Sequence, residues 1–215
     1  MRLQVLDVNV IAGGSTGCLE IGERLVSLEP NLTVTHTHWR DYIRAGAHAG
    51  VPPDAIILGP NSTPFAAYPE DFSTFLRWVR EYCGPLLGIC GGHQVLALAH
   101  GATVAPVHEV PAATTSYQGM PKVSGPTLIS LAHTGHPLLA ELPSSVTLTA
   151  SHVDEVQALP MGFECLAHSE ACRIQIMAHT VRPQFGIQCH PERPPDDPHG
   201  SQLLQNWLTL LRQLT

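Results

Sequence analysis

One short segment of the chain carries the residues best suited to covalent chemistry. The run GPLLGICGGHQVLALAHG predicts a buried strand over Pro85–Ile89 and a helix over Gln94–His100. Between them, Cys90 is flanked by Gly88 and Gly92 with the spacing of a nucleophile elbow. Glycine tolerates the strained backbone of such a turn and the close approach of a substrate. The thiol then lies over a helix N-terminus, where N–H groups and the helix dipole favour a thiolate. We therefore predict that Cys90 is a nucleophile.

A nucleophilic thiol needs a base that takes its proton and returns it to the leaving group. The best candidate is His190, which directly follows a predicted strand over Phe185–Cys189. Residues two apart in an extended chain point the same way, so Glu192 can hold one ring nitrogen of His190 and leave the other facing the thiol. Pro191 biases His190 away from a helical conformation and stiffens the segment. Alone, His190 would be better explained as a capping or core residue, but together with Cys90 it favours the catalytic interpretation.

Acyl transfer also needs a pair of donors for the oxyanion that forms in the reaction. The N–H of Gly91, directly after the predicted nucleophile, is the natural first donor. A second donor is expected from a loop at the end of another strand. Residues 56–63, IILGPNST, fit this role because Gly59 lets the main chain approach closely. A plain turn explains the same loop equally well from its local chemistry alone.

The elements around these groups predict an α/β fold. In the first half, β-like runs alternate with amphipathic helical runs, the order typical of a doubly wound parallel sheet. The predicted strands are Arg2–Asp7, Leu32–Thr37, Ala55–Leu58 and Pro85–Ile89, and the predicted helices are Leu19–Leu28, Asp71–Cys83 and Gln94–His100.

The second half predicts additional antiparallel strands, because short apolar runs are separated by turn residues. They cover Leu128–Leu131, Val146–Ala150, Val156–Leu159, Cys165–His168, Ile174–His179 and Phe185–Cys189. A polar loop over Pro194–Gly200 precedes a final amphipathic helix over Ser201–Leu214. The sequence contains no internal repeat and no linker, so residues 1–215 are expected to form a single domain. The predicted architecture is a mostly parallel sheet, flanked by helices and extended by antiparallel strands.

Composition and charge limit the possible functions. Of the 215 residues, 13% are charged and 44% are hydrophobic, so the chain can bury a full core. A net charge of −7 argues against a surface for nucleic acid or anionic membranes. No apolar stretch approaches the roughly 20 residues of a membrane span. The N-terminus has no signal-peptide pattern and predicts a first strand instead.

Cysteine and histidine usage favours neither disulfides nor a metal. The six cysteines form no close CxxC pair, so we expect free thiols in a reducing cytoplasm. The thirteen histidines include His36-x-His38 and His133-x-x-His136, which have the form of metal-ligand pairs. Neither pair has a third ligand nearby at metal-site spacing, so no metal site is predicted.

The nucleophile and histidine motifs, in this order, resemble those of the class I glutamine amidotransferase family. The first is PLLGICGGHQ around Cys90, and the second is FGIQCHPE around His190 and Glu192. The segment SHVDEV at residues 151–156 resembles one that GMP-synthase-like members place between the two motifs. Asn206-Trp207-Leu208 matches the usual final helix. The resemblance covers nearly the whole chain, from the first strand to the last helix.

This resemblance implies a flavodoxin-like fold and a reaction. The reaction is hydrolysis of the glutamine side-chain amide through a γ-glutamyl thioester on Cys90, which releases ammonia. His190 would act as base and then as acid, and Glu192 would orient it. No metal or organic cofactor is implied for this half-reaction. The residues implied to line the glutamine pocket are Gln94, Ser151, His152 and Asp154.

The chain departs from the family pattern at the oxyanion loop. Members usually carry two adjacent glycines there, whereas this chain has Gly59-Pro60-Asn61 and is one residue shorter by this comparison. Pro60 has no N–H. The second oxyanion donor is therefore expected from Gly59 or Asn61, or only after a loop movement.

Three functions remain open from the sequence. The leading one is an amidotransferase subunit that delivers ammonia to a separate acceptor enzyme, because no synthetase module follows the motifs within these residues. The second is a stand-alone hydrolase of γ-glutamyl peptides or conjugates, with altered segments at Gly59–Thr63 and Tyr117–Gly125 widening the pocket. The third is a non-catalytic regulatory homologue. The altered loop suggests that third function, whereas the intact Cys90, His190 and Glu192 argue against it.

Overall fold

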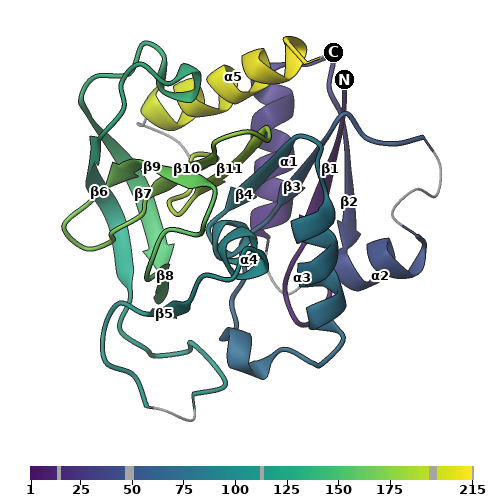
Figure 1. Ribbon diagram of the computed structural model, residues 1–215, viewed down its shortest axis with the longest axis vertical. Coiled ribbons are helices and arrows are strands. Elements are labelled where there is room, and N and C mark those ends of the chain that lie inside the picture. The colour runs from purple at the N-terminus through teal and green to yellow at the C-terminus, as the bar shows by residue number, and fades with distance from the viewer. Residues whose placement is uncertain (14–15, 47–50, 112–113, 194–197, 215) are drawn as a thin grey trace.

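The computed structural model describes residues 1–13, 16–46, 51–111, 114–193 and 198–214 (Figure 1). Within them, a nine-stranded sheet has the order β2-β1-β3-β4-β11-β10-β9-β6-β7. Its parallel part comprises β2 (Thr33–His38), β1 (Arg2–Asp7), β3 (Ala55–Leu58), β4 (Leu86–Ile89) and β11 (Gln184–Ile187). Its antiparallel part comprises β10 (Ile176–His179), β9 (Phe163–His168), β6 (Val123–Leu131) and β7 (Ser145–His152). The predicted fold class is confirmed.

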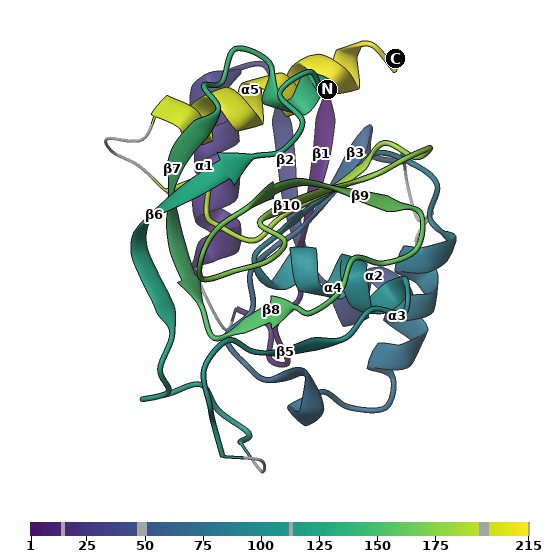
Figure 2. The ribbon, with the colours of Figure 1, turned by 60° about the vertical axis from the view of Figure 1, so that its left-hand side comes forward.

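Helices cover both faces of the sheet, because successive residues of a strand point to opposite sides. Leu3 and Val5 of β1 belong to one hydrophobic cluster, together with residues of α1 (Gly17–Leu28) and α5 (Pro198–Arg212). Leu6 of β1 belongs to a second cluster with residues of three other helices. These are α2 (Trp39–Arg44), α3 (Phe72–Glu81) and α4 (Gly91–Ala99). Figure 2 shows α1 and α5 on one side of the sheet and the other three helices on the opposite side.

The carboxyl ends of the parallel strands bring four distant segments to one edge of the sheet. Asn9 lies just beyond β1, Gly59–Asn61 follow β3, Cys90 follows β4, and Gln188–His190 follow β11. This edge is where open α/β sheets bind their ligands. The predicted chemical groups therefore meet because of strand direction and order, although they are far apart in sequence.

A short antiparallel ribbon stands beside this edge. It pairs β5 (Val104–Pro106) with β8 (Asp154–Val156), and Pro106 lies opposite Asp154. In the connection from β5 to β6, the described residues 107–111 and 114–122 extend away from the sheet in both views (Figures 1 and 2). Two single-turn 3₁₀ helices, Phe65–Ala67 and Pro137–Leu139, complete the described elements.

Several predicted boundaries are wrong. The strand predicted at Val156–Leu159 is instead β8, which ends at Val156, and Leu159 is 37% exposed. The pattern misled because β8 is fixed by pairing with β5, a contact between distant residues. The strand predicted at Leu128–Leu131 begins earlier, at Val123, since Gly125 and Pro126 concealed its first half.

The helices differ from expectation at their starts. The predicted helix at Gln94 begins at Gly91, directly after Cys90. The final helix begins at Pro198 rather than Ser201, and residues 194–197 of the predicted polar loop lie outside the described residues. The short helix α2 was not predicted. It forms because His38 caps its N-terminus, and Trp39 packs against aromatic rings of α3.

All six cysteines are free thiols, as expected. None of the helices in the described ranges combines the length and apolar character that a membrane span requires.

Candidate active site

Cys90 lies on a strained turn between β4 and α4. Its φ of 52° and ψ of −105° fall where residues other than glycine are rarely found. The turn is held in place because the Cys90 N–H donates to the Ile187 carbonyl of β11 at 2.8 Å. The residue is 3% exposed and occupies the N-cap position of α4. A nucleophile elbow is therefore present in the backbone at Cys90.

Two glycines after Cys90 allow neighbouring main chain to lie against the turn. A β-carbon on Gly92 would lie 2.0 Å from the Leu58 carbonyl oxygen, and one on Gly91 would lie 2.5 Å from the Asn61 nitrogen. Real side chains do not tolerate such distances, so both positions require glycine. The loop after β3 is thereby brought against the first turn of α4, beside the sulfur.

His190 and Glu192 form the predicted hydrogen-bonded pair. Nδ1 of His190 lies 2.7 Å from Oε1 of Glu192, and both side chains are almost fully buried. The main chain of His190 is fixed because its N–H donates to the Thr149 carbonyl of β7 at 2.8 Å. The Nε2 atom makes no close hydrogen bond with the described residues, but the charge on the imidazole interacts with the Cys90 sulfur. Glu192 thus orients the imidazole ring, and Nε2 is available to Cys90.

Neighbouring charge controls the protonation of His190. Burial alone would lower the pKa of His190, but the Cys90 sulfur and then the Glu192 carboxylate outweigh burial and raise the pKa above its ordinary value. At neutral pH the histidine is therefore an imidazolium. A positive charge on His190 attracts negative charge on the neighbouring Cys90 sulfur and so favours nucleophilic attack by that sulfur.

The loop after β3 holds both residues expected to supply the second oxyanion donor, Gly59 and Asn61. The Gly59 N–H donates to the Leu6 carbonyl at 3.0 Å, so the expectation that Gly59 offers this N–H to a substrate needs correction. The reason is that Gly59 extends the parallel pairing of β3 with β1 by one residue. The Asn61 nitrogen, in contrast, lies against Gly91 at the elbow.

The side chain of Asn9 anchors this loop on both sides of Asn61. Its Nδ2 donates to the Pro60 carbonyl at 3.2 Å, and its Oδ1 accepts the Ser62 N–H at 3.0 Å. Asn9 is 1% exposed and also donates to the Asp7 carboxylate at 2.6 Å. The Asn9 side chain therefore holds the loop in position through hydrogen bonds to the loop's main chain.

A cavity of about 360 Å³ opens beside the nucleophile, and we call it the catalytic pocket. It is lined by Asn61, Ser62, Cys90, Gln94, Ser116, Tyr117, Gln118, Lys122, Ser151, His152, Val153 and Asp154. The four residues that the family resemblance implied for a glutamine pocket thus lie in one cavity with Cys90.

Gln94 and Asp154 present hydrogen-bond acceptors to this pocket. Nε2 of Gln94 donates to the Asp154 carbonyl at 2.7 Å and to Oε1 of Gln188 at 3.0 Å. Both of its N–H bonds are used, so the part of Gln94 left for a ligand is its carbonyl oxygen. The Asp154 carboxylate accepts the Tyr117 hydroxyl, while its Oδ1 is buried without a hydrogen-bond partner in the described ranges. Burial raises the pKa of Asp154, and the Tyr117 hydrogen bond partly opposes that shift.

Lys122, Ser151 and His152 add further polar groups to the pocket. Lys122 lies with its Nζ 3.4 Å from the Ser151 hydroxyl. The Ser151 carbonyl oxygen is 3.9 Å from the Cys90 sulfur. Burial lowers the pKa of His152 to about 4, so this histidine is neutral at pH 7. Its Nδ1 lies 2.9 Å from the Asp154 carbonyl oxygen, which helps to fix the turn between β7 and β8.

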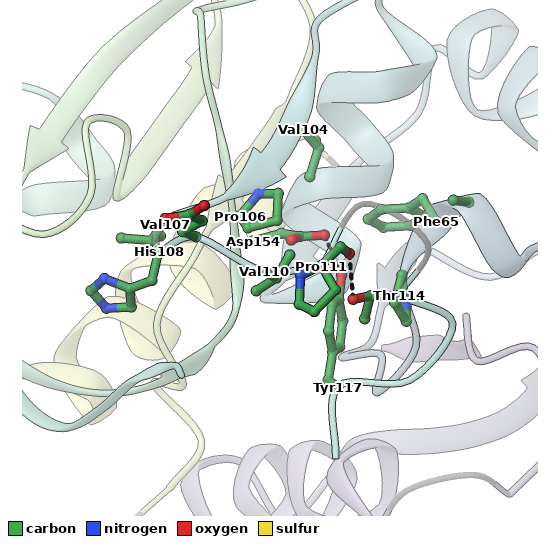
Figure 3. Close-up of a pocket in the computed structure, with 13 residues that line it drawn as sticks. Phe65, Val104, Pro106, Val107, His108, Val110, Pro111, Thr114, Tyr117 and Asp154 are labelled. Carbon is green, nitrogen blue, oxygen red and sulfur yellow. Dashed lines mark hydrogen bonds between the residues drawn. The ribbon is translucent and has the colours of Figure 1, made fainter. Parts of the chain in front are cut away.

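A second cavity of about 500 Å³ shares Tyr117 and Asp154 with the catalytic pocket. Figure 3 shows Tyr117 reaching the Asp154 carboxylate within this cavity, with Phe65, Val104 and Pro106 nearby. Its walls combine apolar residues with the polar side chains of His108, Glu109 and Thr114. In the part of the chain that the structure describes, its lining includes neither Cys90 nor His190. The second cavity is therefore a neighbour of the reacting groups and does not contain them.

The histidines of the first pair that had the form of metal ligands, His36 and His38, contact main-chain carbonyls instead. Nε2 of His36 lies 3.0 Å from the Cys18 carbonyl oxygen, and Nε2 of His38 lies 2.9 Å from the Asn9 carbonyl oxygen. Among residues 1–13, 16–46, 51–111, 114–193 and 198–214, no three His, Cys, Asp or Glu residues gather as metal ligands.

Sequence reasoning gave no individual role to Asn9, Gln188 or Lys122. Gln188 had a usable signal, because it stands two residues before His190 in an extended segment and so points the same way. Asn9 also had one, because it closely follows a strand whose carboxyl end lies at the binding edge. Lys122 had none, since only the folded connection between β5 and β6 brings it to the pocket.

The family model for class-I glutamine amidotransferases matches residues 20–211 of this chain. The chain belongs to the class-I glutamine amidotransferase family. The resemblance seen in the two sequence motifs is thus confirmed over most of the chain.

Similar curated proteins are glutamine-hydrolysing GMP synthase subunits from archaea. The protein from Methanocaldococcus jannaschii is 37% identical over 123 residues, which are 57% of this chain and 58% of that protein. The protein from Methanosarcina barkeri is 36% identical over 62% of this chain and 63% of its own length. The alignments thus span about three fifths of these two relatives. The protein from Thermococcus kodakarensis is 28% identical, and the match spans 83% of this chain and 94% of that protein.

Solved structures support the fold. The crystal structure of a Thermoplasma acidophilum protein, described as a candidate subunit of GMP synthase, superimposes with a TM-score of 0.75 at 22% identity. The match covers 99% of this chain and 95% of that one.

Proposed function

We propose that this protein hydrolyses the side-chain amide of free glutamine through a γ-glutamyl thioester on Cys90 and passes the ammonia to a separate acceptor enzyme. The observation that carries this proposal is the buried His190–Glu192 pair beside a cysteine on a strained elbow. A histidine held by a carboxylate and facing a thiol has the form of an acyl-transfer triad.

In the first half of the reaction, the Cys90 thiolate attacks the γ-carbonyl carbon of glutamine. The carbonyl electrons move to oxygen, and the N–H groups of Gly91 and Asn61 stabilise the oxyanion. The His190 imidazolium then gives its proton to the amide nitrogen as the C–N bond breaks. Ammonia leaves, and the γ-glutamyl group remains on sulfur as a thioester.

In the second half, His190 is neutral and acts as a base toward water. The hydroxide equivalent adds to the thioester carbon, the same two N–H groups hold the oxyanion, and the C–S bond breaks. Glutamate leaves, and the proton on His190 faces a thiolate again. Glu192 keeps the ring in one orientation through both steps.

The polar groups of the catalytic pocket suit the head of an amino acid. We assign the α-ammonium group to the Gln94 carbonyl oxygen and the Asp154 carboxylate, which are acceptors left without a full set of donors. We assign the α-carboxylate to Lys122, which carries the positive charge of this pocket. This placement leaves the amide of the side chain for Cys90 and His190.

The same geometry favours free glutamine over γ-glutamyl conjugates. A substituent on the amide nitrogen would leave from the side of His190, because that residue protonates the leaving group. The larger second cavity contacts neither His190 nor Cys90 in the described part of the chain, so it offers such a substituent no space. The relatives, which are named as subunits of glutamine-hydrolysing GMP synthases, support a separate acceptor protein as the destination of the ammonia.

The test is glutaminase activity of the purified protein, with Cys90→Ala as the matched variant. We expect glutamate release from the wild type, covalent labelling of Cys90 by a glutamine-analogue electrophile, and neither from the variant. A panel of γ-glutamyl amides should be poorer substrates than glutamine. Glutamate release that survives Cys90→Ala would refute the mechanism, and a preference for bulky amides would refute the substrate.

A further inference from the structure

A buried side-chain amide lies directly against the candidate nucleophile. Gln188 follows β11 and is fully buried. Its Nε2 atom lies 3.8 Å from the Cys90 sulfur, within the distance of a hydrogen bond to sulfur. Its own main chain is fixed, because the Gln188 N–H donates to the Gln175 carbonyl at 2.8 Å. The side chain therefore has a defined position beside the reacting atom.

The direction of this amide follows from its neighbours. The Asp154 carbonyl can only accept, so the group of Gln94 that lies 2.7 Å from it is the NH₂. The same NH₂ lies 3.0 Å from the Gln188 amide and must meet an acceptor there, which is Oε1. Since Oε1 of Gln188 faces Gln94, its NH₂ group faces the sulfur.

Other polar groups lie around the elbow and the catalytic pocket. The His190–Glu192 pair follows β11, and the Tyr117–Asp154 pair lies across the catalytic pocket, with neutral His152 at the β7–β8 turn. The helix α4 adds its N-terminal dipole. Gln188 differs from the His190–Glu192 pair because its amide carries no charge. The amide can donate a hydrogen bond to the sulfur without giving up its proton. Donation from it becomes stronger when the sulfur is ionised, because hydrogen bonds to charged groups are the stronger ones.

We propose that Gln188 is a catalytic residue that donates a hydrogen bond to the Cys90 thiolate and, through Oε1, fixes the amide of Gln94 toward the substrate. The bond stabilises the thiolate before attack and again when the thioester breaks and sulfur leaves. This inference rests on the proposed function only where glutamine turnover is measured. The reactivity of Cys90 toward an alkylating agent can be measured without glutamine.

The test compares Gln188→Leu with Gln184→Leu. Gln184 is also fully buried, lies on β11 and donates its side chain to a main-chain carbonyl, that of Tyr82, away from the catalytic pocket. The first readout is alkylation of Cys90 by iodoacetamide at pH 7, followed by mass spectrometry of the Cys90 peptide because Cys83 is exposed. We expect about a tenfold slower rate in Gln188→Leu, the effect of losing one modest hydrogen bond to a charged group. Gln184→Leu should react at the wild-type rate.

The second readout is glutamine turnover. We expect Gln188→Leu to lower kcat by a similar factor and to raise KM, because Gln94 loses the partner that orients it. Gln188→Met, which keeps the length of the side chain without its polar atoms, replaces the leucine variant if that one does not fold. Wild-type rates of alkylation and turnover in a folded Gln188 variant would overturn the inference. A different result would contradict the proposed function instead. In that case, alkylation of Cys90 depends on Gln188, but the wild-type protein does not hydrolyse glutamine.

Discussion

The hydrogen bonds from Asn9 to the loop after β3 lead to a prediction about catalytic rate. Asn9→Ala removes the donor to the Pro60 carbonyl and the acceptor of the Ser62 N–H, the two contacts that hold the loop on either side of Asn61. Each of these two bonds contributes about 1 kcal/mol, and the variant also loses the bond to the charged Asp7 carboxylate, so it should lose about 3–4 kcal/mol of unfolding free energy. The larger effect should be on activity, because the Asn61 N–H would no longer be held against Gly91.

The expected loss of activity follows from the role of an oxyanion donor. Removing one such donor typically lowers kcat by about 10²–10³-fold. We expect Asn9→Ala to lower kcat by at least about a hundredfold, with a much smaller change in KM, because the oxyanion exists only in the transition state and the intermediate. Glutamate release at saturating glutamine measures kcat, and urea denaturation of the same preparation measures the stability loss.

Asn206→Ala is the matched control. Asn206 is likewise buried, at 8% exposure, and its side chain donates to the carbonyls of Leu138 and Ala140 at 2.9 Å each, outside the catalytic pocket. Both variants should lose stability, with the larger loss in Asn9→Ala, but only Asn9→Ala should lose activity. Equal kcat values for the two variants would refute the reasoning that the loop after β3 supplies an oxyanion donor through its fixed position.

Three further predictions concern titratable groups, two of them in the site and the third, His93, buried within α4. Glu192→Gln should lower the pKa of His190, since the ring loses the negative charge that supports its protonated form. The same variant should reduce kcat about a hundredfold or more. An unchanged pH–rate profile would contradict this prediction. Asp154→Asn should raise KM for glutamine about tenfold with little change in kcat, and a kcat defect alone would contradict the assignment of the α-ammonium group. Burial lowers the pKa of His93 in the folded state to about 3, well below the ordinary value of 6.5. Between these two pH values the unfolded state binds more protons than the folded state. The free energy of unfolding therefore falls as the pH falls from 6.5 toward 3. Urea denaturation at pH 7.5 and pH 5.0 should therefore show the wild type losing about 2 kcal/mol more than His93→Leu, and equal losses would contradict the linkage.

The sequence by itself determined the local chemistry of the site. The glycines around Cys90 predict the elbow because a sharp strand-to-helix turn is a property of a few consecutive residues. The two-residue spacing of His190 and Glu192 predicts their hydrogen bond for the same reason, since side chains alternate along an extended chain. The strand pattern of the first half also predicts the parallel sheet, because buried parallel strands are continuous apolar runs.

Only the tertiary structure decided which distant groups complete the site. The Gly59 N–H pairs with β1, and the Asn61 nitrogen meets Gly91, because the parallel pairing of β3 and β1 continues one residue past the strand. The contacts of Gln188 with Cys90 and of Lys122 with Ser151 depend on strand order and on the path of a long connection, and local patterns contain neither. Short-range periodicity can therefore identify a nucleophile and its base, whereas packing between distant segments decides what stabilises the charge they create.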